Sequence, residues 1–328
     1  MDARELRSEP AERIRVAMAA AERAPSVCNT RPWVLTRDGT HITVSADVDR
    51  RLDVTDPAAR ELVISCGAAL YNIRTALRAH GDLPHVVAFP DPDRPGLLAD
   101  VAVTGRVEPS DLERTLFASI RRRRTHRGPF LADVDDVRLV RALSAAATAE
   151  EATLHLITDD SLVRSLGGLV AGAEFLHRHE RGHAEELARW VRTPDSRLLT
   201  GVRAEDFPPT EQTDSGMFPG RDYGGNRIRG LLDVHGEVSG TVAILSTPAD
   251  TRSSHLSAGQ ALQRMLLTAT AGGVSAAFHT QPLEEPLLRA FITERICGAH
   301  PQMIMRLGRA HPHRSALDDE IKAVLAGS

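Results

Sequence analysis

The feature that most constrains the fold is a repeated helical segment. Residues 67–81 read GAALYNIRTALRAHG and residues 259–273 read GQALQRMLLTATAGG, so both begin with Gly-x-Ala-Leu and end in glycine fourteen residues later. A strand-like stretch precedes each helix, and another follows its terminal glycine. These two segments are either amphipathic helices that are similar by coincidence, or parts of two copies of one α+β unit, each contributing a helix to a common core.

Apolar spacing and cap signals predict helices and strands in alternation along the chain. Helices are predicted at residues 9–23 with Ser8 as the N-cap, from Asp56-Pro57 to Gly81, from the capping box Ser110-x-x-Glu113 into the arginines at 121–124, and at 133–148, 160–190 and 257–271. Strands are predicted at 33–36 and 41–44 around an Asp38-Gly39 hairpin turn, and at 97–104, 152–158, 242–245, 274–278 and 303–307.

Residues 192–230 lack the apolar periodicity of their surroundings. The segment contains four prolines and several glycines, with scattered apolar side chains such as Leu198, Leu199 and Phe218. A structureless insert of this length is usually functional or disordered. Its mixture of residues suits a segment that lies over a cleft and buries single side chains there, so we expect a lid.

The stretch APSVCNTRPW, residues 24–33, follows the first predicted helix. Pro25 and Pro32 prevent the helix from continuing and favour a rigid polar elbow. Such an elbow fixes its backbone in one conformation, and the residues alone leave open what it holds.

Four consecutive arginines, at positions 121–124, lead into Thr125, His126 and Arg127. Like charges this close repel one another unless an anion neutralises them. The planar guanidinium group suits phosphate oxygens, and Thr125 adds a hydroxyl. The alternative is a solvated basic helix end, which the helix dipole favours at a C-terminus.

Composition argues against several classes of protein. Of the 328 residues 42% are hydrophobic and 26% are charged, as in globular proteins, and the net charge of −4 gives no overall attraction to nucleic acid. We find no apolar run long enough for a membrane span, no signal peptide and no Gly-x-Gly-x-x-Gly dinucleotide motif. Three separated cysteines, Cys28, Cys66 and Cys297, indicate a reducing cytoplasm.

No metal site is predicted. His179 and His183 are spaced as two ligands on one helix face, with His177 nearby. The sequence between them misplaces the glutamate of the zinc-protease pattern His-Glu-x-x-His and offers no clear third ligand. We therefore expect three surface histidines.

Two of these segments resemble signatures of the nitroreductase-like FMN-binding superfamily. RRTHRGPF is similar to its Arg-Arg-Ser/Thr-x-Arg-x-(Pro)-Phe signature, and APSVCNTRPW to Ala-Pro-Ser-x-x-Asn-x-Gln-Pro-Trp, with Arg31 where the family has Gln. The Pro-Ser motif comes first here. This order, with DPAARELVISCGAALYNIRTALRAHG, QPLE and PQMIMRLGR, resembles the actinobacterial Acg family of fused, tandem nitroreductase-like chains.

The resemblance implies an α+β fold of two tandem nitroreductase-like units, residues 1–108 and 109–328, that form an intramolecular pseudo-dimer with a lid-like insertion at about 192–230. Each half carries only one signature, so one FMN per chain is implied. The implied cofactor-binding residues are Pro25, Ser26, Val27, Asn29 and Arg31 beside the flavin, Arg123, Arg124, Thr125 and Arg127 at its phosphate, Gly273 along the flavin, and Arg309 or Arg314 near the phosphate.

The implied function is that of an FMN-dependent oxidoreductase using NAD(P)H and a nitro or quinone acceptor. The cofactor supplies the reactivity, so no catalytic side chain is predicted. The alternative is a catalytically silent flavin-binding or storage protein whose lid closes the FMN site. Small molecules are the expected partners, with neither nucleic acid nor membrane, and the chain is expected to work as a monomer in the cytoplasm.

Overall fold

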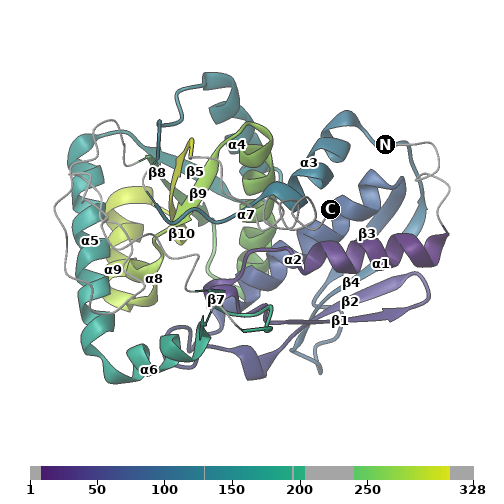
Figure 1. The fold of residues 1–328 in the computed structure, drawn as a ribbon, viewed down its shortest axis with the longest axis horizontal. Coiled ribbons are helices and arrows are strands. Elements are labelled where there is room, and N and C mark those ends of the chain that lie inside the picture. Colours follow the sequence, from purple (N-terminus) through teal and green to yellow (C-terminus); the bar gives the residue numbers. More distant parts are fainter. Residues whose placement is uncertain (1–8, 129, 194–195, 204–239, 311–328) are drawn as a thin grey trace, which may run out of the picture.

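The computed structural model describes residues 9–128, 130–193, 196–203 and 240–310. Two four-stranded sheets lie on either side of a pair of long helices, α2 (Arg60–Ala79) and α7 (Arg252–Ala271), as Figure 1 shows. The mixed helix-and-strand class expected from the sequence is therefore confirmed. Most of the predicted lid, from residue 204 onward, lies outside the described residues.

The first sheet has the order β1-β2-β4-β3, and each neighbouring pair is antiparallel. The predicted turn at Asp38-Gly39 joins β1 to β2, and Gly39 has a φ of +54°, which glycine adopts readily. Helices α1 and α2 pack with this sheet in one apolar core. The sheet and these two helices comprise, in chain order, α1 (Pro10–Ala21), β1 (Trp33–Asp38), β2 (His41–Ala46), α2, β3 (Asp82–Ala88) and β4 (Leu97–Arg106).

The second sheet has the order β5-β8-β10-β9, again with antiparallel neighbours. Taken in chain order, its elements correspond one by one to those of the first sheet, and the resulting strand order is the same. They are α4 (Val137–Thr148), β5 (Thr153–Ile157), β8 (Thr241–Thr247), α7, β9 (Ser275–Phe278) and β10 (His300–Gly308).

The central helices cross where Gly67 meets Gly259. A Cβ atom on Gly67 would lie 2.3 Å from the Leu256 carbonyl oxygen, and one on Gly259 would lie 2.0 Å from the Ile64 carbonyl oxygen. Both pairs, Gly67 with Gly259 and Ile64 with Leu256, are 192 residues apart in sequence, so the contacts are reciprocal. The shared glycine of the repeat is thus explained by packing, because no larger residue fits this backbone approach.

Helix α3 (Asp111–Arg122) begins with the predicted capping box. The Ser110 hydroxyl accepts the backbone N–H of Glu113, and the Glu113 carboxylate accepts the backbone N–H of Ser110 at 2.7 Å. The helix lies against both α2 and α7. The arginine segment follows it and reaches the second sheet, where Thr125 forms a parallel bridge with Ala276 of β9.

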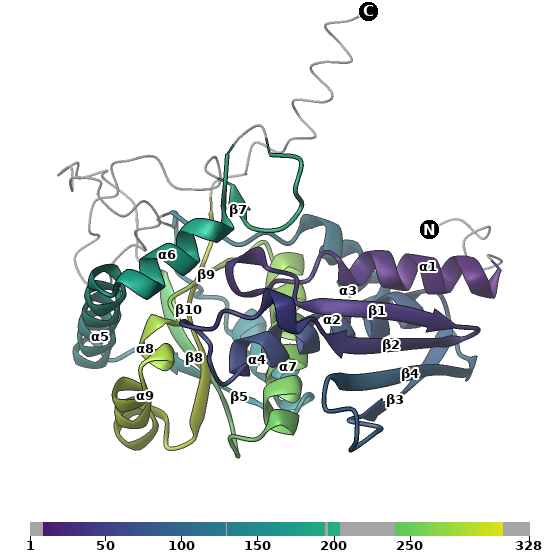
Figure 2. The ribbon, with the colours of Figure 1, turned by 90° about the horizontal axis from the view of Figure 1, so that it is seen from below.

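A helical insert separates β5 from β8, where the first sheet has only its two-residue hairpin turn. Helix α6 leads directly into β6, which pairs in parallel with β7 (Figure 2). The insert contains α5 (Asp160–His179), α6 (Arg181–Trp190), β6 (Val191–Arg192) and β7 (Val202–Arg203), while α8 (Gln281–Glu284), α9 (Pro286–Ile292) and a π-helical turn (Thr293–Cys297) connect β9 to β10.

Among the described helices the longest are α2, α5 and α7, with 20 residues each. None of the described helices has an apolar stretch sufficient to cross a bilayer.

Four predicted helix boundaries were wrong. Helix α4 begins at Val137, not at residue 133, because the Asp136 side chain caps it. Helix α2 begins at Arg60, not at Asp56, because Ala59 takes a left-handed conformation and the Asp56 carboxylate instead accepts the backbone N–H of Leu62 at 2.8 Å. Helix α7 begins five residues earlier than predicted, since Thr251 caps it. The predicted helix 160–190 is two helices, because Glu180 takes an extended conformation between them.

Candidate functional site

The elbow is a strained turn fixed by its own hydrogen bonds. Val27–Asn29 forms a single 3₁₀ turn, the Ser26 hydroxyl accepts the backbone N–H of Arg31 at 3.0 Å, and the backbone N–H of Val27 donates to the Ser65 hydroxyl at 3.2 Å. Cys28, Asn29 and Arg31 have φ values of +45°, +53° and +50°. Left-handed backbone costs a residue other than glycine about 1–2 kcal/mol, and such strain is concentrated at functional sites.

Contacts from the helical insert hold the elbow from outside. The Asn29 side-chain amide donates to the carbonyl oxygens of Leu199 at 3.1 Å and Gly201 at 2.8 Å, and the Gly201 N–H donates to the Asn29 carbonyl at 2.9 Å. Figure 2 shows β7 above the purple loop that joins α1 to β1. The Asn29 amide, predicted to face a ligand, is therefore engaged by the start of the segment predicted to be a lid.

The arginine segment lies beside the elbow. The Arg123 guanidinium donates to the Arg23 carbonyl at 3.4 Å, which joins the end of α3 to the end of α1. Burial lowers the pKa of Arg23, and the like charges of Arg124, Arg121 and Arg31 lower it further. The structure thus brings Arg31 of the elbow and the arginines after α3 into one positively charged neighbourhood.

Arg123 is the most perturbed member of this cluster. Its burial, followed by the like charges of Arg124 and Arg127, lowers its pKa to about 10. A nearby carboxylate is that of Glu22, whose Oε2 lies 3.5 Å from Nη1 of Arg31. Because like charges gathered in a partly desolvated place are costly, the cluster favours an anionic ligand.

Several polar atoms of this neighbourhood are buried without a hydrogen-bond partner among the described residues. They are the Nε atoms of Arg31 and Arg123 and the hydroxyl of Thr30, whose residue is fully buried. A buried donor without a partner costs about 1–3 kcal/mol, so these atoms point to a polar ligand that would satisfy them.

The remaining residues of the arginine segment have different roles. The Arg124 side chain donates to the carbonyl oxygens of Arg121 and Arg123, at 3.0 and 2.9 Å, and so covers the C-terminal end of α3. Thr125 joins β9 through its backbone, and Arg127 is half-buried. The segment ends at Phe130, whose ring fills the space beside Gly240 and Gly308.

The late residues of the predicted site lie along the second sheet. Gly273 follows Gly272, the C-cap of α7, with a φ of +74° and open space where a side chain would be. The Leu131 N–H donates to the Arg309 carbonyl at 2.7 Å, so Arg309 lies next to the end of the arginine segment and is exposed. Arg314 lies outside the described residues.

Sequence reasoning missed Arg23, Thr30 and the contact with Gly201. Arg23 directly precedes the elbow signature and Thr30 stands at one of its unspecified positions, and their place in the site depends on the neighbouring segments. The Asn29–Gly201 contact joins residues 172 positions apart, for which the sequence carries no signal.

The prediction of surface histidines was wrong for two of the three. His177 and His183 are 6% and 3% exposed, and their rings stack with centroids 3.8 Å apart, while His179 is exposed. The chain changes direction at Glu180 between α5 and α6, and this brings the rings of His177 and His183 together.

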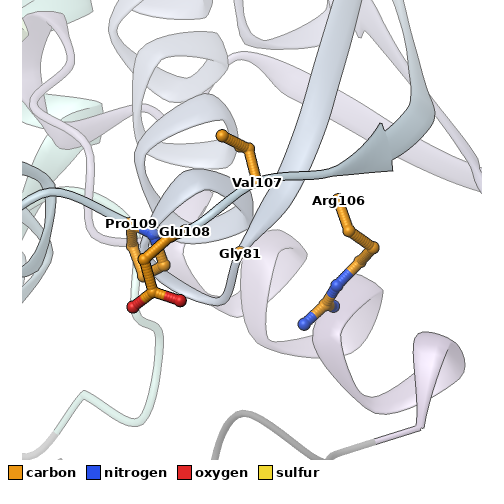
Figure 3. A pocket seen from close by; sticks show the side chains of 5 residues that line it. All are labelled: Gly81, Arg106, Val107, Glu108 and Pro109. Carbon is orange, nitrogen blue, oxygen red and sulfur yellow. The ribbon is translucent and has the colours of Figure 1, made fainter.

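Two surface hollows lie away from the arginine cluster. One of about 230 Å³ is lined by Gly81 and residues 106–109 (Figure 3), where the Arg106 guanidinium already pairs with Asp82 at 2.9 Å. The other, of about 340 Å³, is lined by Glu151 and residues of the 247–257 stretch. Neither collects groups that would perform chemistry together.

Comparison with known proteins gives full-length relatives. The Mycobacterium tuberculosis H37Rv protein named "Putative NAD(P)H nitroreductase Rv3131" is 33% identical over 306 residues, which cover 92% of this chain and 86% of that protein. The protein of the same strain named "Putative NAD(P)H nitroreductase acg" is 29% identical over 312 residues, covering 90% and 89%. No protein-family model matches the chain.

A crystal structure of a Bacteroides fragilis nitroreductase with bound FMN is 15% identical, with a TM-score of 0.37, over 61% of this chain and 90% of that one. The matches to the two mycobacterial relatives extend over nearly the whole chain. The chain belongs to the Acg family of nitroreductase-like proteins.

Proposed function

We propose that this protein binds FMN and acts as an oxidoreductase that takes electrons from NAD(P)H and reduces a nitro compound or a quinone. The names of its relatives support a nitroreductase-like activity. The observation that carries the proposal is the cluster of like-charged arginines beside a strained elbow, with buried guanidinium donors that lack partners among the described residues.

The residues present fit FMN. Burial, then repulsion from Arg124 and Arg127, lowers the pKa of Arg123. A phosphate group would offset both effects, and its oxygens would accept from donors such as the buried Nε atom of that residue. We assign the phosphate to Arg123, Arg124, Thr125 and Arg127, with Arg309 or Arg314 as a further contact. When bound, FMN supplies the hydride and electron transfer chemistry.

The elbow would orient the isoalloxazine ring. We assign Pro25, Ser26, Val27, Asn29 and Arg31 to this role, with Gly273 along the ring. Arg31 carries a positive charge where the family has a neutral glutamine, so it would stabilise negative charge on a bound ring. The Glu22 carboxylate lies 3.5 Å from the Arg31 guanidinium and would offset part of the positive charge that acts on the ring.

We further propose that residues 1–108 and 109–328 are two copies of one unit that pack as an internal pseudo-dimer. The same strand order in both sheets and the reciprocal contacts of Gly67 and Gly259 support it. Each signature occurs in one copy only, so a single FMN would bind per chain and the monomer would be complete. Isolated residues 1–108 should then be insoluble, because one face of α2 would lose its cover.

One observation favours the alternative of a closed, catalytically silent flavin protein. The Asn29 amide, at the centre of the elbow, is bound by Leu199 and Gly201. Gly201 has a φ of +86°, and a Cβ there would lie 2.5 Å from the Trp190 carbonyl oxygen, so Gly201→Ala should displace these residues from the elbow. Faster NAD(P)H oxidation by this variant, with FMN retained, would support the closed state in the unaltered protein.

The deciding experiment is to purify the full chain and measure its flavin content and reduction. We expect a yellow protein with one FMN released per chain on denaturation, and bleaching of the flavin absorbance by NADH or NADPH under anaerobic conditions. Bound FMN that resists both nucleotides but is bleached by dithionite would select the silent alternative. A colourless protein that does not bind added FMN would contradict both proposals.

A further inference from the structure

Two buried histidines and a buried glutamate meet where the turn between α5 and α6 packs against α8. The side chains of His177, His183 and Glu284 are 7%, 4% and 4% exposed. His177 Nδ1 and His183 Nε2 lie 3.5 Å and 3.7 Å from the same carboxylate oxygen, Glu284 Oε2. We infer that these three side chains bind a divalent transition-metal ion such as Zn²⁺.

The spacing of the three donor atoms suits such an ion. Ligand atoms bound to tetrahedral zinc at 2.0–2.2 Å are about 3.4 Å apart. The two distances to Glu284 Oε2 are close to this value, and all three donor atoms lie within 4.8 Å of one another. Imidazole nitrogen with carboxylate oxygen is a donor set that favours zinc and its neighbours over magnesium or calcium.

The surroundings of His177 have the form expected around a metal ligand. While its Nδ1 faces Glu284, its Nε2 lies 2.9 Å from the Glu285 carboxylate. Metal-binding histidines usually donate their second ring N–H to a carboxylate, which fixes the tautomer and orients the ring. A neutral imidazole with its Nδ1 lone pair toward the site is the form that binds a cation.

Other acidic side chains lie near the two histidines. Glu186 is buried beside His183 and accepts from the backbone N–H groups of Val54 and Thr55 and from the Thr55 hydroxyl. With Glu284 and Glu285 it places three carboxylates around two imidazoles. Because a buried carboxylate is costly without a compensating positive charge, a divalent cation at this position would stabilise the cluster.

Binding would require a small rearrangement of the rings. They stack at an interplanar angle of 21°, whereas a metal ion lies close to the plane of each imidazole that binds it. Rotation about χ2 of either histidine would turn both nitrogens toward one point, with Thr55 Oγ1, 3.4 Å from His183 Nε2, or water as a fourth ligand.

The position of the site indicates a structural role. It joins the α5–α6 turn to α8, and through Glu186 it reaches the loop before α2. Helix α6 then runs directly into β6, whose partner β7 follows the Gly201 contact with the elbow. A metal here would hold the helical insert in register with the elbow, independently of whether FMN is bound.

The test is a metal titration of the full-length protein after treatment with a chelator and its removal. We expect one Co²⁺ per chain, with the visible bands of four-coordinate cobalt at wavelengths beyond the flavin absorption, and displacement by Zn²⁺. His183→Asn and Glu284→Gln should each weaken Co²⁺ binding by at least about tenfold. His179→Asn is the matched control, because His179 is exposed at the end of α5, two residues from His177, and this variant should bind Co²⁺ as the unaltered protein does.

Two results would overturn the inference. One is the absence of stoichiometric Co²⁺ and Zn²⁺ binding by the folded, unaltered protein, which would leave a protonated imidazole paired with Glu284 as the explanation of the cluster. The other is unchanged binding in both folded variants. If a variant fails to fold, the titration of the unaltered protein alone decides.

Discussion

Replacing Gly67 by alanine should destabilise the protein although alanine is the better helix former. The new Cβ would lie 2.3 Å from the Leu256 carbonyl oxygen and 3.0 Å from the Gly259 Cα, so the two central helices must move apart by roughly 1 Å to restore van der Waals contact. Overpacking costs about 1–3 kcal/mol, and more where backbone meets backbone as here. Subtracting about 1 kcal/mol for helix propensity leaves a net loss of about 2 kcal/mol.

Thermal and urea denaturation followed by circular dichroism measure this loss. A loss of 2 kcal/mol should lower the Tm by roughly 3 °C, because the unfolding entropy of 328 residues is about 0.7 kcal/mol/K. Gly168→Ala is the matched control, because Gly168 also lies within a 20-residue helix and has open space at its Cβ position. That control should be neutral or stabilised by up to about 1 kcal/mol.

The reciprocal geometry gives a second measurement. Gly259→Ala meets the Ile64 carbonyl oxygen at 2.0 Å, and the same separation of the helices relieves both contacts. The double variant should therefore lose less stability than the sum of the two single losses. Strict additivity, or a Gly67→Ala variant as stable as Gly168→Ala, would refute the close crossing of α2 and α7.

Three further predictions concern the site and its surroundings. Arg127→Ala should weaken FMN binding about 10- to 150-fold, as expected for a lost charge-assisted contact of about 1.5–3 kcal/mol. Arg122→Ala should leave binding unchanged, because the Arg122 side chain bonds to Ser119. Fluorescence titration with FMN compares the two variants, and equal losses of affinity would contradict the assignment. Burial, then the charge of Glu61, raises the pKa of Asp56 from 3.8 to about 6, so the folded state holds the proton more tightly than the unfolded state. The contribution of Asp56 to stability therefore falls by up to about 3 kcal/mol as the pH rises from 4 to 6. Asp56→Asn should reduce the change of the urea midpoint over that pH range, and an unchanged pH profile would count against this reasoning. His183→Asn should lower the Tm only when Zn²⁺ is present, measured with and without chelator, and an equal loss in both conditions would indicate packing alone.

Local features of the fold could be predicted because neighbouring residues determine them. The capping box of Ser110 and Glu113 and the Asp38-Gly39 turn need only a few consecutive residues, and both lie where predicted. Apolar periodicity located α2 and α7 to within about five residues, but it did not detect the break between α5 and α6. The Gly-x-Ala-Leu repeat left coincidence and duplication open, and its first glycine, at Gly67 and Gly259, lies where the two helices touch.

Two signature segments also indicated the family from the sequence, because a motif is recognised by its residue types and their spacing, wherever it lies in the fold. Their resemblance to nitroreductase-like proteins, and to the Acg family in particular, agrees with relatives that extend over nearly the whole chain. The roles of the individual site residues stay predictions until FMN binding is measured.

Tertiary structure alone decided which groups meet. The left-handed backbone at Cys28, Asn29 and Arg31 is held by distant partners such as Gly201, and local propensity disfavours it. The convergence of Arg23 with Arg124 depends on α1 and α3 ending at the same place.

The burial of His177 and His183 likewise follows from a change of chain direction at Glu180, which helical periodicity does not predict. The sequence determined the helices, the strands and the chemical character of each segment, because these depend on neighbouring residues. The site depends on contacts between residues 100 or more positions apart, whose free energy arises only after the chain has packed.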